Sequence, residues 1–172
     1  MIMWQDFLSY WNSLWEVIPI WRYEVGLFVF LIGMVICLKI WGFRKGFRFN
    51  IGLLLIEYVV LIYCTTVFSR RTTVLQYNFM PFWSYFSYFG GENDRLLMEN
   101  IMNVVVFVPV GLLAGVAFRG MKWMKVMVTG LGLSIGIEVM QFVFRKGFSE
   151  VDDVIHNTFG CMIGYLIWLA LK

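Results

Sequence analysis

Charged side chains are scarce in this sequence. Asp, Glu, Lys and Arg together make up 15% of its 172 residues, against about a quarter of an average soluble domain. Hydrophobic residues reach 60% and aromatic residues 19%, which is more apolar surface than so short a chain can bury in a water-soluble core. The composition therefore excludes an ordinary soluble domain and indicates a protein that lies in lipid.

Net charge, cysteine and histidine are also low, and each shortage excludes a class of function. The net charge of +3 is too small for a nucleic-acid-binding protein. Cys37, Cys64 and Cys161 form no CxxC pair, so we interpret them as packing residues in apolar helices. The only histidine, His156, has no His or Cys partner and is interpreted as a polar residue at a helix entry, not as a general base. We expect no metal and no cofactor.

The first 24 residues are rich in tryptophan and lack a basic start. Residues 1–10 contain Asp6 and no Lys or Arg, so a cleavable signal peptide is not expected. Large apolar side chains recur at three- and four-residue steps, at Trp4, Phe7, Leu8, Trp11 and Trp15. This spacing is typical of an amphipathic helix that lies in a membrane interface. We therefore expect an interfacial segment at 1–24, followed by a transmembrane bundle at 25–172.

Long apolar runs dominate the rest of the chain. They cover residues 25–42, 51–68, 101–118, 123–144 and 152–171. Each is close to the roughly 20 residues that cross a hydrocarbon core, and a spanning segment must satisfy its own backbone hydrogen bonds. The sequence therefore predicts an all-α integral membrane bundle of about five transmembrane helices, preceded by the interfacial helix.

Pairs of glycine spaced four apart occur in the last three runs. They are Gly111 and Gly115, Gly132 and Gly136, and Gly160 and Gly164. Small residues at this spacing allow two helix backbones to approach closely. We expect these three helices to pack tightly together.

Basic residues in short loops predict the orientation of the bundle. The loops at 43–50 and 119–125 concentrate Lys and Arg, which favours the cytoplasmic side. The N-terminus and the connections at 69–100 and 145–151 are then outside, and the C-terminus is cytoplasmic. The middle of the long connection, residues 78–89, is too aromatic for a free loop, and we expect it to lie in the interface or to re-enter the membrane.

Polar residues concentrate at the predicted outer ends of four separate segments. They are Arg70, Arg71, Asn100, Asn103, Glu138, Gln141, Asp152, Asp153 and Asn157. At about 1.5 Å of rise per helical residue, these groups reach a similar depth on the same side of the membrane. We predict that they meet in an outward-facing polar pocket that binds a ligand.

Simpler interpretations of the same residues stay open. A carboxylate inside an apolar helix, such as Glu138, costs about 2.5–3.5 kcal/mol on insertion scales unless it is protonated, hydrated or paired with a cation. A buried Glu–Arg pair, with Asn and Gln joining helices, would satisfy this need without any ligand. Asp152 and Asp153 also suit the positive end of a helix, or could hold a divalent cation near Glu150 and Glu138.

The order and spacing of these residues resemble the VanZ-like family. The stretches that carry the resemblance are NFMPF at 78–82, Asn100-x-x-Asn103-x-x-x-Phe107-x-Pro109-x-Gly111, Glu138-x-x-Gln141 and Glu150-x-Asp152-Asp153-x-x-x-Asn157-x-x-Gly160. The resemblance covers residues 70–171, with Glu150 at a position where Asp is commoner. It implies a multi-pass protein of the bacterial cytoplasmic membrane and a link to resistance against the glycopeptide teicoplanin. It implies no catalytic residue.

Two classes of function fit this sequence. The first is a non-enzymatic envelope protein whose outer pocket, rimmed by aromatic residues at 79–89, binds a membrane lipid, a lipid-linked cell-wall precursor or a lipoglycopeptide antibiotic. The second is a membrane-embedded enzyme for a lipid-linked envelope substrate, with Glu138, Asp152 or Asp153 as acid or base and Arg70 or Arg71 holding an anionic group.

The absence of known catalytic motifs favours the first class, a non-enzymatic binding protein. The sequence contains no nucleophile elbow, HExxH or phosphate-binding loop. It also contains no inverted repeat, and its polar groups lie towards one face, which argues against a transporter with a site at the membrane midplane. We therefore favour a binding protein over an enzyme. The sequence leaves the oligomeric state open, a homo-oligomer included.

Overall fold

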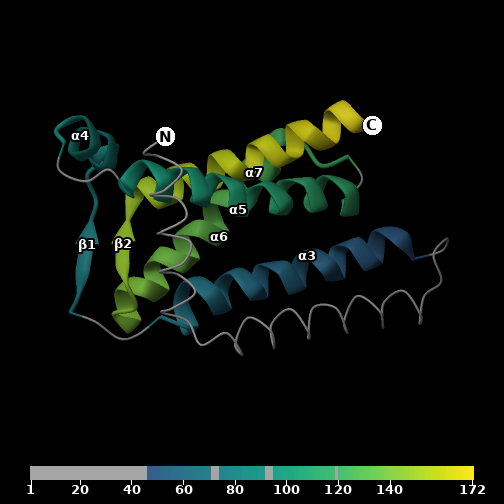
Figure 1. Ribbon diagram of the computed structural model, residues 1–172. Helices are drawn as coiled ribbons and strands as arrows, with labels where there is room; N and C mark the ends of the chain where they lie inside the picture. The colour runs from purple at the N-terminus through teal and green to yellow at the C-terminus, as the bar shows by residue number, and fades with distance from the viewer. Residues whose placement is uncertain (1–45, 71–73, 92–94, 119) are drawn as a thin grey trace.

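A computed structural model describes residues 46–70, 74–91, 95–118 and 120–172 (Figure 1). In chain order its elements are helix α3 (Phe47–Tyr63), the π-helical turn η1 (Cys64–Phe68), strand β1 (Gln76–Asn78), helices α4 (Trp83–Phe89), α5 (Arg95–Ala117) and α6 (Trp123–Phe144), strand β2 (Phe148–Glu150) and helix α7 (Val151–Leu171). The predicted interfacial helix at 1–24 and the predicted span at 25–42 lie outside the described residues.

Four of the described helical segments are long and apolar enough to cross a membrane. They are α3 continued by η1, α5, α6 and α7, and they correspond to the predicted spans at 51–68, 101–118, 123–144 and 152–171. The all-α membrane bundle is therefore confirmed. Helix α5 begins at Arg95 rather than at 101, because Arg95, Glu99 and Asn100 interrupt the apolar run in its first turns.

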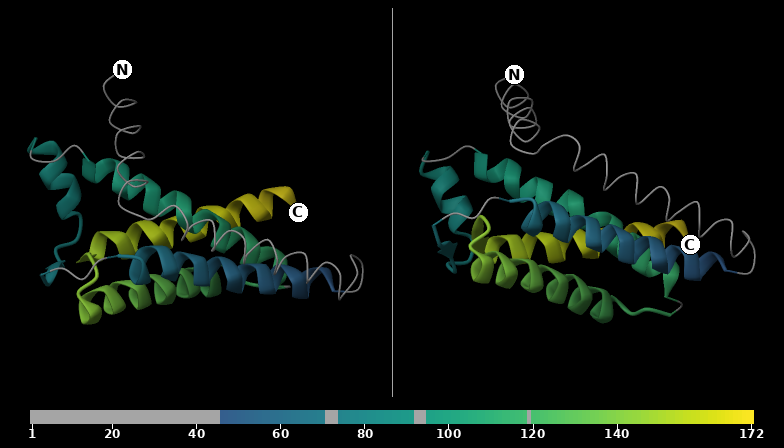
Figure 2. Two further views of the ribbon diagram at one scale, coloured as in Figure 1. Left: turned by 60° about the horizontal axis from the view of Figure 1, so that its bottom comes forward. Right: turned by 90° about the horizontal axis from the view of Figure 1, so that it is seen from below.

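Helix α7 packs against both α5 and α6, and α3 lies along α5 on the other side (Figures 1 and 2). Glycines allow α5 and α7 to pack almost backbone to backbone. A Cβ atom added at Gly160 would overlap the carbonyl oxygen of Val104, and one at Gly164 would overlap that of Val108. The close packing expected from the glycine pairs is present between these two helices.

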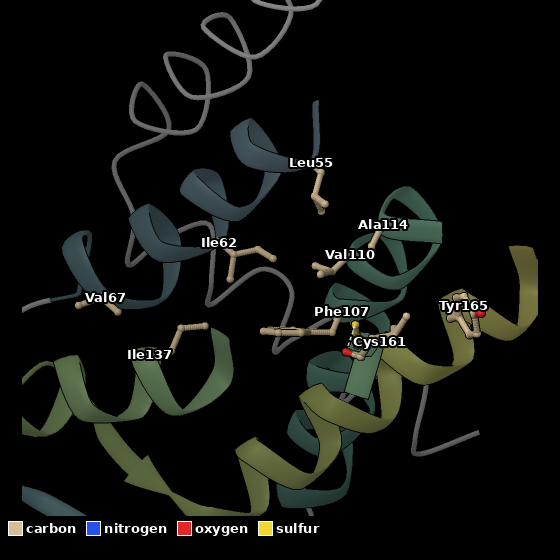
Figure 3. Close-up of a cluster of buried hydrophobic side chains, with 10 residues drawn as sticks. Leu55, Ile62, Val67, Phe107, Val110, Ala114, Ile137, Cys161 and Tyr165 are labelled. Atoms are coloured by element: carbon tan, nitrogen blue, oxygen red, sulfur yellow. Dashed lines mark hydrogen bonds between the residues drawn. The ribbon is translucent and has the colours of Figure 1, made fainter. Parts of the chain in front are cut away.

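A buried apolar cluster joins the four long helices (Figure 3). Phe107 of α5 is 2% exposed and lies between α3, α6 and α7. The cluster consists of Leu55, Ile62, Val67, Phe107, Val110, Ala114, Val126, Ile137, Cys161 and Tyr165. Cys161 is fully buried in it, as expected of a packing residue, whereas Cys64 is exposed and Cys37 lies outside the described chain.

The long connection between α3 and α5 contains a strand and a helix that sequence patterns did not predict. Strand β1 pairs in parallel with β2, with Gln76 opposite Phe148 and Asn78 opposite Glu150. Strands of three residues are too short to show an alternating pattern. The pairing holds the connection against the loop between α6 and α7, at the end of the bundle where α5 and α7 begin (Figure 1).

Candidate functional site

The polar residues predicted from the sequence gather at one end of the bundle. This end is formed by the starts of α5 and α7 and the ends of η1 and α6, with β1, β2 and α4 beside them (Figures 1 and 2). Arg71 lies outside the described residues. The other eight predicted residues divide into those whose side chains hold the fold and those that form a charged cluster.

Asp152 fixes helix α4 to helix α7. Its side chain is fully buried, and its two carboxylate oxygens accept hydrogen bonds from the backbone N–H of Phe82, the backbone N–H of Ser84 and the Ser84 hydroxyl. The Asn100 amide donates to the same hydroxyl at 3.0 Å. Asp152 therefore caps the start of α4 rather than that of its own helix, and both of its oxygens are occupied by protein groups.

His156 forms a second link between the same two helices. Its Nδ1 lies 2.6 Å from the carbonyl oxygen of Asp152, and its Nε2 lies 2.7 Å from the Tyr85 hydroxyl. Because a carbonyl can only accept, Nδ1 carries a proton, and Nε2 of the neutral ring accepts from Tyr85. The sequence did not reveal the contact between Tyr85 and His156, since these two residues are 71 positions apart.

Gln141 and Asn157 connect neighbouring helices. The Gln141 amide donates to the Thr66 carbonyl at 3.1 Å, and the Asn157 amide donates to the Ser134 hydroxyl at 2.8 Å. Both side chains are buried. These bonds correspond to the simpler interpretation, in which amide side chains join helices in an apolar environment.

The remaining charged side chains form what we call the charged cluster, which consists of Arg70, Glu99, Glu138, Glu150 and Asp153. The Arg70 guanidinium is near enough to attract the carboxylates of Glu99, Glu138 and Asp153. Three carboxylates thus face the Arg70 guanidinium, and the Arg95 guanidinium also attracts that of Glu99. Glu99 was not among the residues predicted from the sequence, although it precedes Asn100 directly.

Two hydrogen bonds hold carboxylates of the charged cluster in place. Asp153 accepts from the Asn103 amide at 2.6 Å, and Glu138 accepts from the backbone N–H of Glu150 at 2.8 Å. The negative charge of Asp153 also acts on Glu138, so these two side chains lie near each other although they come from different helices. Within the described ranges, no three His, Cys, Asp or Glu side chains are arranged to hold a metal ion.

Glu150, which precedes α7, has a strongly perturbed acidity. Burial, followed by the negative charges of Asp153, Glu99 and Glu138, raises the pKa of Glu150 to about 8. Its carboxyl group is therefore mostly protonated at neutral pH. A neutral acid at this point lowers the repulsion within the charged cluster.

This perturbed pKa predicts a pH-dependent difference between the protein and its Glu150→Gln variant. An unfolded glutamate releases its proton near its ordinary pKa of 4.5, whereas folded Glu150 holds it to about pH 8. The free energy of unfolding therefore falls as the pH rises between these two pKa values. The loss stays constant at higher pH. Glutamine avoids this loss.

Thermal unfolding in detergent micelles from pH 5 to 9 measures this difference. We expect the melting temperature of Glu150→Gln minus that of the unmodified protein to rise between pH 5 and pH 8 and then to level off. A difference that stays constant across the range would contradict the assigned pKa.

The region that matches known proteins contains nearly all of these elements. The family model described as VanZ/LLP1 matches residues 53–172. The chain belongs to the VanZ-like family. Protein VanZ of Enterococcus faecium is 30% identical over 124 residues, which cover 68% of this chain and 75% of the relative. No solved structure matches. The whole charged cluster and the Asp152 contacts lie within the VanZ-like region, and the protein is a VanZ-like membrane protein.

Proposed function

We propose that this VanZ-like protein contributes to resistance against teicoplanin or a related lipoglycopeptide by binding an amphiphile at the charged cluster. The amphiphile is a lipid head group, a lipid-linked cell-wall precursor or the antibiotic itself. One observation carries the proposal: charged side chains from four separate segments gather at a single end of an otherwise apolar bundle.

Packing alone does not require these charges. Ionisable residues in membrane-spanning segments are costly, and they usually serve a ligand, an ion or a proton. Asn157 and Ser134 already show how uncharged groups join two helices in this bundle. A structural ion pair needs one acid for each base, but Arg70 attracts three carboxylates and shares only that of Glu99 with Arg95. This imbalance favours a cluster that meets a polar ligand.

The side chains of the cluster suit a head group of mixed polarity. Arg70 is exposed and can bind a phosphate or carboxylate, while the partly exposed Asp153 can accept hydrogen bonds from amine, amide or hydroxyl groups. Aromatic rings lie at the same end of the bundle: Tyr77 stacks on Phe79 with ring centroids 5.0 Å apart and meets Phe142 edge-on at 5.6 Å. Such rings suit the apolar part of an amphiphile.

The proposal places this end of the bundle on the outer face of the bacterial cytoplasmic membrane. The opposite end carries the short basic loops, and basic loops of this kind favour the cytoplasm. The outer leaflet and the cell wall are where a glycopeptide antibiotic and the finished wall precursors meet. An N-terminus outside and a cytoplasmic C-terminus complete this topology.

Resistance measurements on Glu138→Gln and Asp153→Asn test the proposal. Both variants replace an ionisable carboxyl group of the cluster by an amide of nearly the same size. We expect either change to lower the minimal inhibitory concentration of teicoplanin towards that of cells without the protein. Glu57→Gln is the matched control, because it makes the same chemical change in spanning helix α3, and it should retain resistance.

A direct measurement of ligand binding is the second part of the test. Native mass spectrometry of the purified protein with phospholipid, lipid-linked wall precursor and teicoplanin should detect one of these ligands, and Asp153→Asn should weaken its binding. If both variants reach normal abundance in the membrane and leave resistance and all three binding measurements unchanged, the proposal is wrong.

A further inference from the structure

Helix α4 has its polar side inside and its aromatic side outside. Ser84 and Ser87, three positions apart, are 1% and 9% exposed. Phe86 and Phe89 lie three positions apart in the helix and are 66% and 81% exposed, and Phe82, just before the helix, is 51% exposed. A helix on a water-soluble protein shows the reverse pattern, with its apolar stripe towards the core.

Hydrogen bonds fix this reversed orientation. The start of α4 is bound by Asp152, and Ser84 also accepts a bond from Asn100. Phe82 adopts a left-handed backbone conformation, with φ of 63°, which is uncommon for a bulky residue and needs support from its surroundings. Its N–H donates to Asp152. Helix α4 therefore cannot rotate its phenylalanines inward without breaking the contacts of a fully buried carboxylate.

The exposed aromatic surface extends beyond α4 along the preceding connection. Tyr77, Phe79 and Met80 are 53%, 57% and 58% exposed. Residues 74–91 contain eight aromatic side chains and no charged one. An apolar surface without charges has no electrostatic attraction to offer a protein or an anionic lipid, whereas it fits the boundary between acyl chains and head groups.

We infer that residues 77–89 form a membrane-docking element whose aromatic face inserts into the lipid of the leaflet at this end of the bundle. Its partner is the acyl region of any bilayer, independent of lipid charge. The spanning helices α5 and α7, to which α4 is bound, already place it at the membrane boundary. The charged cluster would then lie beside lipid rather than beneath open water. This inference does not depend on resistance or on any ligand of the cluster.

Fluorescent labelling of the full chain in vesicles tests the docking. In a variant without its three native cysteines, Phe86→Cys and Phe89→Cys, each made separately, would carry an environment-sensitive dye. The proteins are placed in phosphatidylcholine vesicles with and without phosphatidylglycerol. Lys122→Cys is the matched control, because Lys122 is also exposed but lies in the loop before α6 at the other end. Lipids with a spin label near the head group or in the acyl chain, and aqueous iodide, serve as quenchers.

We expect the dyes at 86 and 89 to be quenched several-fold more by spin-labelled acyl chains than the dye at 122, and to be protected from iodide. The phosphatidylglycerol content should make no difference. Three results would overturn the inference: quenching by iodide at 86 and 89, a depth that depends on anionic lipid, or a disulfide cross-link between two copies at these positions without lipid quenching. Melting temperatures of the labelled variants confirm that each remains folded.

Discussion

The Gly164→Ala variant is expected to lose the close packing of α5 and α7 and with it most of the stability of the bundle. The added methyl group would overlap the carbonyl oxygen of Val108 and crowd the backbone N–H of Leu112. Both atoms belong to the α5 backbone, which cannot move aside as a flexible side chain can. Overpacking of this kind costs about 3 kcal/mol, and here the two helices must separate along their length.

Thermal unfolding in detergent micelles measures this effect, and the chain offers a matched control. Gly132 lies in α6, in the same type of four-residue glycine pair, but a Cβ atom added there meets nothing within 4 Å. Gly132→Ala should leave the melting temperature unchanged or raise it slightly, because alanine favours a helix by up to about 1 kcal/mol over glycine. Equal effects of the two substitutions would show that the α5–α7 contact is looser than described.

Replacing Asp152 by alanine is expected to release α4 from the bundle. The substitution leaves the N–H groups of Phe82 and Ser84 and the Ser84 hydroxyl without their acceptor. Removing one partner from a buried, charged hydrogen-bond network costs about 3–5 kcal/mol. Because α4 is short, it has little stability of its own, and the loss should fall on residues 74–91 before it reaches the spanning helices.

Hydrogen exchange measured by mass spectrometry separates this local loss from global unfolding. In Asp152→Ala, amide exchange should rise strongly in peptides from 74–91 and stay low in α6. Asp152→Asn keeps one oxygen acceptor and should show an intermediate increase. Protection of 74–91 that is unchanged in Asp152→Ala would mean that α4 is held mainly by other contacts, such as the bond between Tyr85 and His156.

The membrane bundle could be predicted because the apolar runs that form its spanning helices are visible in the sequence. Long apolar runs such as 123–144 match the bounds of α6 directly, since a spanning helix must satisfy its own hydrogen bonds. The meeting of Glu138, Asn103 and Asp153 followed from the same argument, because residues at the same ends of antiparallel helices share a depth. Depth, however, does not say which polar groups contact each other.

The sequence did not predict which polar residues at this end hold the fold and which form the charged cluster. Asp152 and Asp153 are neighbours in the sequence, yet one is fully buried against α4 and the other faces Asn103 and the charged cluster. Successive helical residues point about 100° apart, so the choice depends on what packs on each side. That information lies in α4 and β1, whose short, aromatic sequence has no regular pattern.

The parallel pairing of β1 with β2 has a consequence for how the protein is synthesised. Strand β1 leaves the ribosome some seventy residues before its partner, and Asp152 comes two residues after the end of that partner. During this interval β1 has no strand partner, α4 lacks the Asp152 acceptor, and Glu138 has no Glu150 amide to bind. The spanning helices can enter the membrane one after another, but this end of the molecule is completed only when the last helix arrives.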